Sequence, residues 1–536
     1  MKIITMMAQQ RLVVRFALWS CAWLLLSVVL HLCAPARFPL FGTQRVRRID
    51  DRAIELWTTH IGNHAVQPQD RYSLRELGFR THVYAELLRR GASLELNALS
   101  EVLWKFVPGV WELRELSRPR HTVSGSLVPL REGIVMAVTS NTVLAALQTI
   151  TVLRSTHKCS LPIEVYHYGA SELDKPLKSA LESMRDVRVI DIYELPYFSS
   201  AMEDDAGRIP NGPESQARQA MALLATKFQR VVLSAPDITW MADPALLFQQ
   251  QGFLQTGTFL FRERGLPATA RAQRMVSWLK DQFDESWPSQ RLSSLPFWDY
   301  VADGVMTPKV AAFDKSRAGV FSALLANLAM HQKSSRDHIW SRFSQGQVES
   351  LFLSFELSNM PYHLSENTPG AVGSFVGNDW FGSTQQDGEA SICSARAVHF
   401  LSQMPVAPLE RHNGSSSIYS GFSGGIFRST RGASSKAVLA PQPLWLDAPI
   451  FETRTTETFF NATAWAMHGR WEMDVTQASI NHNSPWCFRG ATLRSVDQLG
   501  STRINLDRIK SILRQCNNHF RPLVGLFAAM PVRSEE

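Results

Sequence analysis

The chain has 536 residues, of which 45% are hydrophobic and 19% are charged. This composition excludes wholesale disorder and leaves room for one large domain or two ordinary ones. The formal net charge is +7, but the arginines are scattered singly outside the flanks of one apolar segment, so we expect no nucleic-acid partner.

That apolar segment lies near the N-terminus, at residues 16–34, and contains no Asp, Glu, Lys or Arg. A helix of roughly 20 apolar residues spans a bilayer, whereas the apolar part of a cleaved signal peptide, the alternative, normally has about 7–15. We therefore predict a cytoplasmic tail at residues 1–15 and a retained single transmembrane anchor at 16–34. Basic residues on both sides of the segment leave its orientation open by the positive-inside rule.

Downstream features favour a body in the secretory lumen. Asn413 and Asn461 each begin an N-x-[ST] glycosylation sequon, and we predict that Asn461 is glycosylated. Four cysteines follow the anchor, an even number that permits two disulfides in three connectivities. Within a small C-terminal module, we predict a disulfide between Cys487 and Cys516.

Residues 35–130 are predicted to be a stem followed by a helical region. Apolar residues recur at helical spacing in 50–57, 75–90 and 92–106, and residues 118–129 have the composition of a linker.

The pattern then changes to alternating strands and helices, within a domain that we predict at residues 131–430, before a C-terminal extension at 431–536. The predicted strands are 133–139, 161–168, 187–192 and 230–233, and the predicted helices between them are 142–155, 171–184 and 216–227. This order is typical of a Rossmann-like α/β domain with a mostly parallel sheet covered on both faces.

Two nucleotide-binding classes are disfavoured by missing motifs. No G-x-G-x-x-G follows the first strand, and the chain has no G-x-x-x-x-G-K-[ST]. A dinucleotide oxidoreductase and a P-loop enzyme are therefore not expected. Ligands of open α/β sheets bind at the carboxyl ends of the strands, so the site should lie in the loops there.

Several sequence blocks occur in an order that resembles a known family. They are GIVMAVTSN (133–141), TVLRSTHKCSLPIEVYHYG (151–169), QAMALLATKFQRVVLSAPDITWMADPALLF (219–248), TGTFLFRER (256–264), FSQGQVESLFLSFELSNMPY (343–362) and AVHFLSQMPVAPLERHNGS (397–415). On these blocks, which cover about half of the chain, it resembles the fungal α-mannosyltransferases that build outer mannan branches, glycosyltransferase family 71.

The resemblance implies a GT-A fold, retention of configuration, GDP-mannose as donor and a divalent metal, Mn²⁺. It also implies a type II Golgi membrane protein, with its catalytic domain in the lumen, that acts on a mannosyl glycan acceptor in protein glycosylation or cell-wall mannan synthesis. An α-1,3 linkage is favoured over α-1,2, and a complex with other mannosyltransferases is a further expectation.

The family normally holds its metal with an Asp-x-Asp motif after the fourth strand. Here the motif reads Ala235-Pro236-Asp237, so only the second carboxylate is present. Carboxylates are hard ligands suited to Mn²⁺, which acts as a Lewis acid on the leaving group. The resemblance therefore implies Asp237 as a metal ligand and catalytic residue, with His399 as a second ligand. Asp243, by contrast, precedes Pro244 and is predicted to open a helix.

The donor is expected at the carboxyl ends of the strands. Gln219 stands where the family usually has a lysine, and the adjacent Arg218 is the candidate for the diphosphate, although neighbouring helix positions point about 100° apart. The predicted donor-binding residues are Thr139, Ser140, Asn141, Arg218 and Asn413.

Glu349 matches an acidic position of the family and is predicted to be catalytic. Asp314-Lys315 matches a D-K pair in the family's pattern, but the acid expected before it is replaced by the stretch Thr307-Pro308-Lys309. These departures leave an alternative open, in which the chain is a catalytically impaired homologue that serves as a membrane-anchored glycan-binding or complex subunit.

Overall fold

The computed structural model describes residues 51–401, with gaps, and five short later segments. The gaps are 65, 121–125, 170–171, 174, 199–214, 284–288, 340–348, 377–390 and 394–395, and the later segments are 443–448, 464–467, 469–473, 486–489 and 492–495. The predicted anchor at 16–34 lies outside these residues. Within them, no helix is both long and apolar enough to cross a membrane.

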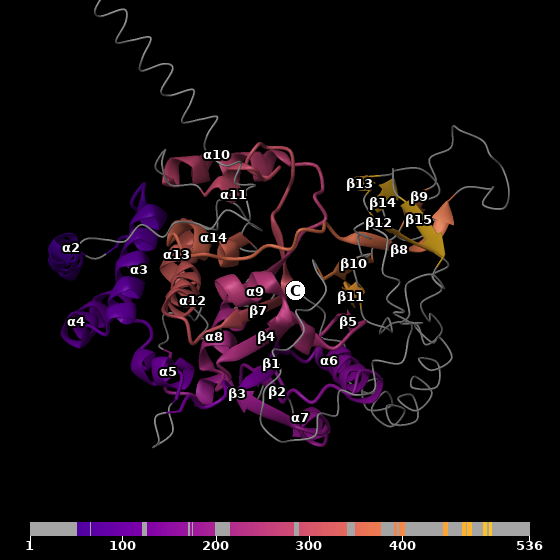
Figure 1. Ribbon diagram of the computed structural model, residues 1–536, viewed down its shortest axis with the longest axis horizontal. Coiled ribbons are helices and arrows are strands. Elements are labelled where there is room, and N and C mark those ends of the chain that lie inside the picture. The colour runs from indigo at the N-terminus through magenta and orange to yellow at the C-terminus, as the bar shows by residue number, and fades with distance from the viewer. Residues whose placement is uncertain are drawn as a thin grey trace, which may run out of the picture. The chain divides into compact units, whose positions relative to one another are not determined.

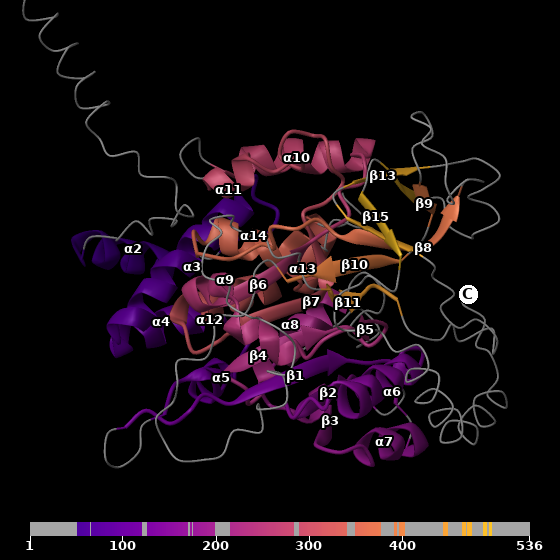
Figure 2. The same cartoon turned by 45° about the vertical axis from the view of Figure 1, so that its right-hand side comes forward.

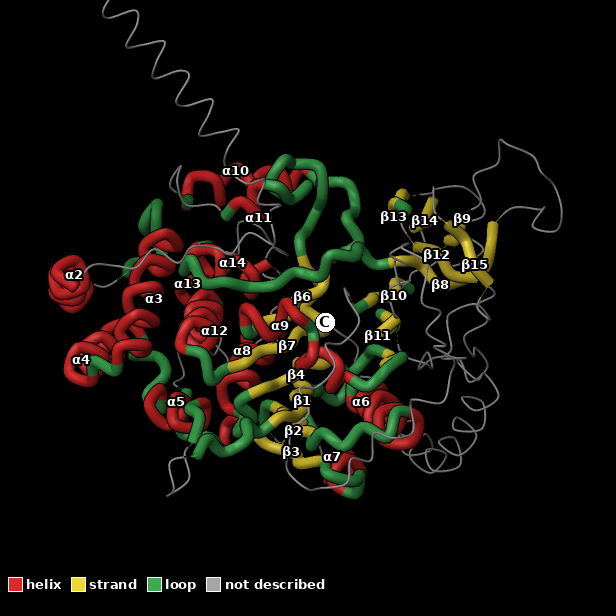
Figure 3. Tube along the Cα trace, in the orientation of Figure 1, coloured by secondary structure: helices red, strands yellow, loops and turns green. Residues whose placement is uncertain are grey.

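The first sheet has the strand order β3-β2-β1-β4-β7-β6 (Figure 1 and Figure 3). Its strands are β1 (Glu132–Ala137), β2 (Ile163–His167), β3 (Val187–Asp191), β4 (Arg230–Ser234), β6 (Thr258–Arg262) and β7 (Met306–Asp314). Strands β3, β2, β1 and β4 are parallel, whereas β7 runs antiparallel to both β4 and β6. The predicted α/β sheet is confirmed, with one strand reversed.

Alternate residues of each strand face two different hydrophobic cores, as the pleat of a strand requires. In β1, Ile134 and Met136 belong to one core and Val135 to the other. One face is covered by α6 (Val143–Thr151), the π-helix Val152–Thr156, α7 (Lys175–Glu182), the 3₁₀ helix η5 (Pro244–Gln249) and α9 (Gln251–Thr256). The other is covered chiefly by α8 (Ser215–Ala225), α12 (Ala318–Met330) and α14 (Ser350–Leu357).

The predicted helical region is helical and packs into that second core. Its helices are α2 (Asp51–Asn63), α3 (Ser73–Arg90), α4 (Ser93–Leu103) and α5 (Val110–Ser117), the last of which the spacing did not indicate. Buried side chains from all four helices belong to the core that α8 and α12 share. The remaining described helices are α10 (Ala270–Gln282), α11 (Gln290–Ser293), α13 (Lys333–His338) and the 3₁₀ helix η2 (Ile192–Glu194).

A second, nine-stranded sheet has the order β13-β14-β9-β8-β10-β11-β5, with β12 pairing β8 and β15 (Figure 1 and Figure 2). Its strands are β5 (Thr239–Trp240), β8 (Gly370–Val376), β9 (Ser391–Cys393), β10 (Ala397–Phe400), β11 (Pro443–Leu446), β12 (Ala464–Met467), β13 (Arg470–Met473), β14 (Trp486–Arg489) and β15 (Thr492–Ser495). The described strands of this sheet all pair antiparallel.

Strand β11 connects the second sheet to the segment that follows β4 of the first sheet. It pairs antiparallel with β5, which follows the end of β4 by a few residues, and with β10 (Figure 1). Leu444 and Trp445 are fully buried, and Pro443 occupies the first position of the strand, where a missing N–H is tolerated. The backbone pairing therefore crosses the boundary that the sequence suggested near residue 430.

Candidate active site

Polar residues follow β1 at the carboxyl edge of the first sheet. The Thr139 backbone N–H donates to Thr142 Oγ1 at 2.9 Å, and α6 begins at the next residue. The side chains of Ser140 and Asn141 are exposed. Since β1 and β4 are parallel neighbours, this loop lies beside the loop that carries Asp237. The three residues lie where a donor site was predicted, and their role in binding remains a prediction.

The Asp237 loop is held from two sides. On one side, the α6 hydroxyl Thr149 Oγ1 lies 2.8 Å from the carbonyl oxygen of Pro236 and 2.7 Å from that of Ile238. On the other, the Ala235 N–H donates to the Lys309 carbonyl of β7 at 2.6 Å. The Asp237 side chain itself is 40% exposed. The loop thus presents a carboxylate to solvent from a fixed backbone.

Four charged residues of the described part of the chain are joined by ion pairs at this point, and we call them the Lys309 cluster: Asp237, Arg264, Lys309 and Asp447. Lys309 Nζ lies 2.7 Å from Asp237 Oδ2 and 2.7 Å from Asp447 Oδ1. The second oxygen of Asp447 accepts from an Arg264 terminal nitrogen at 3.1 Å. The cluster draws on the loop after β4, the end of β6, strand β7 and the end of β11, and so spans both sheets.

The charges of the cluster hold one another in their ionised forms. Burial alone would lower the pKa of Lys309, but the Asp447 and Asp237 carboxylates outweigh it and raise that pKa. For Asp447, burial would raise the pKa, but Lys309 and Arg264 outweigh it, and the pKa is lowered. An ammonium and a carboxylate therefore face each other at neutral pH.

His399 lies on β10, next to the cluster. Its ring stacks on Trp445 with centroids 3.8 Å apart and planes 3° apart, and the residue is 3% exposed. Burial lowers the pKa of the imidazole to about 3, although the Asp447 charge acts in the opposite direction. The imidazole of His399 is therefore neutral, and it lies buried against Trp445 of β11.

The described residues do not fit a divalent metal ion at this point. Nowhere among them do three His, Cys, Asp or Glu side chains group so as to hold a metal. Asp237 Oδ2, the expected ligand atom, accepts from the Lys309 ammonium. His399 is stacked on Trp445, and no interaction joins it to Asp237 in the described part of the chain. The metal roles of Asp237 and His399 therefore remain predictions.

Arg218 is buried and engaged elsewhere. Its guanidinium forms a bidentate ion pair with Glu172, in which the Nη2 to Oε1 distance is 2.6 Å, and it lies over the Tyr168 ring at 4.3 Å. The residue is 2% exposed. A phosphate would have to compete with Glu172 for this side chain. The neighbouring Gln219 has a buried Oε1 without a hydrogen-bond partner among the described residues.

Glu349 lies in the core rather than at the surface of the strand ends. Its Oε1 accepts from the Val305 N–H at 2.9 Å, and a Cβ at Gly304 would come within 2.7 Å of that oxygen. Burial raises the pKa of Glu349 to about 8, and the neighbouring Glu263 charge adds to the effect. This geometry suits a protonated Glu349 carboxyl that holds the backbone at Val305, just before β7. The predicted catalytic role of Glu349 stays a prediction.

Two other sequence motifs have structural partners. Asp243 caps η5, since its side chain accepts from the Ala245 N–H at 3.0 Å with Pro244 in the first position, which confirms the prediction. Lys315 is fully buried, and its ammonium donates to the carbonyls of Leu224 and Thr226 at the end of α8. Lys315 thus fastens the end of β7 to the end of α8.

Several predicted residues lie outside the described part of the chain, namely Asn413, Asn461 and Cys516. Cys487 is disulfide-bonded, and the backbone register of β14 and β9 sets it opposite Cys393. The predicted Cys487–Cys516 pairing is not tested by these residues.

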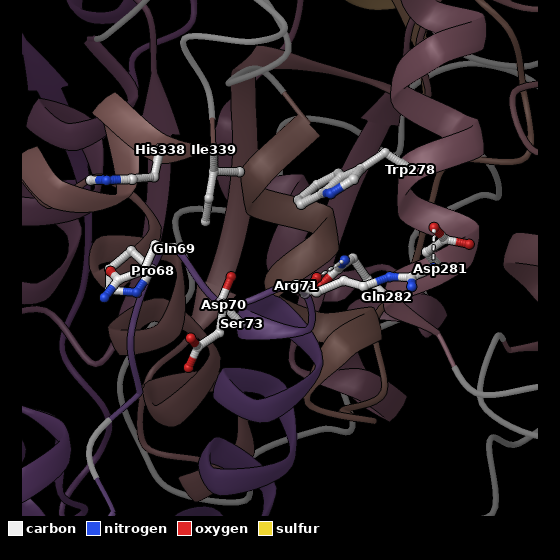
Figure 4. A pocket seen from close by; sticks show the side chains of 10 residues that line it. All are labelled: Pro68, Gln69, Asp70, Arg71, Ser73, Trp278, Asp281, Gln282, His338 and Ile339. Atoms are coloured by element: carbon white, nitrogen blue, oxygen red, sulfur yellow. Dashed lines mark hydrogen bonds and ion pairs between the residues drawn. The ribbon is translucent and has the colours of Figure 1, made fainter.

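A pocket of about 280 Å³ lies away from this edge of the sheet. It is bounded by the segment before α3, by α10 and by α13 (Figure 4). Its lining residues are Pro68, Gln69, Asp70, Arg71, Ser73, Trp278, Asp281, Gln282, His338 and Ile339. None of the predicted site residues is among them.

Sequence reasoning missed three members of the Lys309 cluster. Lys309 was noted only as a departure from an acidic position, Arg264 only as part of a block, and Asp447 lies in a proline-flanked stretch with the composition of a linker. The apolar run at residues 444–446, directly before Asp447, was a signal in the sequence that could have revealed this residue. A short apolar run that ends in a carboxylate is typical of a strand that carries a site residue.

The α/β part of the chain is similar to known proteins. The family model described as "Mannosyltransferase putative" matches residues 131–401, half of the chain. No curated protein sequence matches the chain. Among solved structures, mouse xyloside xylosyltransferase 1 in its apo form is similar at 12% identity, over 44% of this chain and 85% of that chain, with a TM-score of 0.28.

Two fungal structures are also similar. The mannosyltransferase Ktr4p from S. cerevisiae in complex with GDP has 10% identity over 48% of this chain and 77% of that one, with a TM-score of 0.26. Core-mannan synthase A (CmsA/Ktr4) from Aspergillus fumigatus, in its Mn/GDP form, has 8% identity over 46% of this chain and 75% of that one, with a TM-score of 0.27.

Proposed function

The chain belongs to the family described as "Mannosyltransferase putative", and we propose that it transfers mannose from GDP-mannose to a mannosyl glycan acceptor with retention of configuration. The match over residues 131–401 is the observation that carries the proposal, because it includes β1, the Asp237 loop, Lys309 and β10. Within this proposal, an α-1,3 linkage is favoured over α-1,2.

The transfer breaks the bond between mannose C1 and the β-phosphate oxygen and forms a bond from C1 to an acceptor oxygen. The acceptor proton goes to the departing phosphate in a front-side attack, or to a base after a double displacement through a carboxylate. In both routes negative charge grows on the GDP diphosphate. Preorganised cations lower the energy of that charge. The cations of the Lys309 cluster are Lys309, which is paired with Asp237, and Arg264, which is paired with Asp447.

The loop after β1 suits the nucleotide. Ser140 and Asn141 are exposed, and their backbone leads into α6, whose N-terminal amides favour an anion. The Asp237 loop lies beside it, held by Thr149 of the same helix. We therefore assign the nucleotide to the edge between β1 and β4, with its diphosphate toward the Lys309 cluster.

Transfer assays test this proposal directly. The full chain is incubated with radiolabelled GDP-mannose, UDP-glucose or UDP-galactose and with mannose oligosaccharides, and the linkage of the product is determined. We expect transfer from GDP-mannose alone, and a loss of about 100-fold or more in Asp237→Ala. Leu254→Ala, at a residue 42% exposed and away from the cluster, is the matched control. Transfer from a UDP-sugar instead would show that the donor assignment is wrong.

We also propose a type II Golgi membrane protein with a lumenal catalytic domain. The apolar segment 16–34 and the Asn461 sequon support it. The protein should stay in the membrane fraction after carbonate washing and should lose mass on endoglycosidase treatment. Asn461→Gln should abolish that mass change. A protein released by carbonate would contradict the anchor.

The alternative of a catalytically impaired homologue has one observation in its favour. Asp237 is the only acid of the expected Asp-x-Asp motif, and Lys309 occupies its Oδ2. Under this alternative, the chain would bind mannose oligosaccharides but release no GDP from GDP-mannose in the presence of any of them. Coupled measurement of GDP release and of oligosaccharide binding separates the two functions.

A further inference from the structure

We propose that the Lys309 ammonium takes the role that a divalent metal ion would play at Asp237, so that the donor diphosphate binds and leaves without a metal. The inference rests on the proposed function, because it concerns the diphosphate of a nucleotide-sugar donor. It assigns to Lys309 a direct contact with that diphosphate.

The geometry around Lys309 is that of a cation held between two carboxylates. Asp237 and Asp447 reach Nζ from different sheets, each with one oxygen at 2.7 Å. An ammonium has three N–H donors, and these two contacts use two of them. The Lys309 side chain is 32% exposed, so the third donor is available to a ligand that arrives from solvent at the strand ends.

The position of Nζ also opposes a metal at Asp237. Oxygen ligands hold Mg²⁺ at about 2.0–2.1 Å, and a dication at that distance from Asp237 Oδ2 would lie next to an ammonium 2.7 Å from the same oxygen. Like charges so close together repel strongly where water is partly excluded. Displacing Lys309 would in turn leave Asp447 with Arg264 as its remaining cation in the cluster.

Arg264 completes the replacement by fixing the second carboxylate. Its guanidinium donates to Asp447 Oδ2 at 3.1 Å and lies over the Trp471 ring at 5.3 Å. Because arginine keeps its charge at all accessible pH values, Asp447 stays ionised and keeps its other oxygen turned to Lys309. Lys309 is thereby held in one place before a ligand arrives. The two carboxylates position the ammonium in the way that protein ligands position a metal ion.

Two binding measurements on the full chain test the inference without relying on turnover. GDP affinity is measured by calorimetry in EDTA and again in Mn²⁺, and Mn²⁺ alone is titrated and followed by electron paramagnetic resonance. We expect the wild-type dissociation constant for GDP to change less than twofold between EDTA and Mn²⁺, and no stoichiometric Mn²⁺ binding.

Substitutions at Lys309 should reverse this behaviour. In Lys309→Ala, GDP affinity in EDTA should fall at least tenfold and recover partly with Mn²⁺. Lys309→Asp should bind one Mn²⁺ and depend on it for GDP. Lys309→Arg should keep metal-independent binding because it keeps the charge. Lys333→Ala, which removes another lysine paired to a carboxylate on the surface, is the matched control and should leave both measurements unchanged.

The outcomes separate this inference from the proposed function. Wild-type GDP binding that is lost in EDTA and restored by Mn²⁺ overturns the inference alone, as does a Lys309→Ala variant with unchanged GDP affinity. Metal-independent binding of UDP in place of GDP overturns the proposed donor and upholds the inference. If neither nucleotide binds under any condition, both are overturned. The wild-type measurements decide the matter even where a Lys309 variant does not fold.

Discussion

The two sheets of this protein are built in opposite ways, and the candidate site lies where they meet. The first sheet takes its strands from one continuous stretch, residues 132–314, and has helices on both faces. The second takes short strands from residues 239–495 and joins them in antiparallel order. The first sheet supplies fixed strand ends, and the second brings Asp447 and His399 to them. Each sheet alone carries only part of the Lys309 cluster.

The largest effect on stability is expected in the first sheet, at Phe313. This side chain is fully buried on β7, between β4 and β6. Phe313→Ala should lower the free energy of unfolding by about 3–5 kcal/mol, because it removes apolar contacts and leaves a cavity. Urea unfolding measures the change. The exposed Leu254→Ala should stay within about 0.5 kcal/mol of the wild type. A loss in the free energy of unfolding below about 1 kcal/mol in Phe313→Ala would show that the packing of Phe313 does not stabilise the first sheet as expected.

The corresponding test of the second sheet is Cys487, which is disulfide-bonded. Its register partner on the neighbouring strand is Cys393, so we expect a Cys393–Cys487 bond rather than the Cys487–Cys516 bond predicted from the sequence. Cys487→Ser should cost about 2–4 kcal/mol, and reduction of the wild type should cost the same. Mass mapping of non-reduced peptides identifies the pair, and a Cys487–Cys516 peptide would restore the earlier prediction.

The free energy of unfolding should depend on pH through Glu349, which precedes α14 in the stretch of chain between β7 and β8. Because its folded pKa of about 8 is raised above the usual value of 4.5, the folded state holds a proton that the unfolded state loses. Its contribution to stability is therefore full below about pH 4.5 and is lost as the pH rises to about 8, by an amount on the order of 2–4 kcal/mol.

Glu349→Gln should remove that part of the pH dependence. Urea unfolding at pH 5 and pH 8 measures it, with Glu95→Gln, at an exposed position, as the control that keeps the wild-type difference. An unchanged difference in Glu349→Gln would show that the buried carboxyl is not the titrating group.

The smallest effect is expected at the attachment of the Asp237 loop. Thr149→Val keeps the shape of the side chain but removes the hydroxyl between the carbonyls of Pro236 and Ile238. We expect a loss of about 1 kcal/mol in stability and a few-fold weaker binding of GDP. Thr151→Val, which removes a hydroxyl bonded within the same helix, should leave GDP binding unchanged. Equal effects at both positions would argue against a link between α6 and the site.

The four parallel strands β1 to β4 of the first sheet were predictable because their signals are local, whereas β6 and β7 were not among the predicted strands. Each strand is a short apolar run, each helix follows at the expected distance, and Asp243-Pro244 marks a helix start by cap chemistry alone. The placement of residues 139–141 followed from the same logic, since the carboxyl ends of parallel strands share one edge.

The Lys309 cluster was not predictable in this way, because long-range pairing creates it. Lys309 faces Asp237 only because β7 runs antiparallel to β4, with Lys309 O accepting from Ala235 N. Asp447 arrives only because β11 pairs with the two-residue strand β5. Prolines flank β11 in the sequence, and local composition therefore indicated a linker where the structure has a buried strand.

The pairing of β5 with β11 has a consequence for how the protein is made. Thr239 Oγ1 donates to the carbonyl of Ala448 across 209 residues of chain. At a synthesis rate of about 5–20 residues per second, the Asp237 loop waits roughly 10–40 s on the ribosome for its partner strand. During that interval β5 lacks its partner strand, and Lys309 lacks the second of its two carboxylates, Asp447. The Lys309 cluster is thus completed late in synthesis, and a chain shortened before residue 443 would lack Asp447.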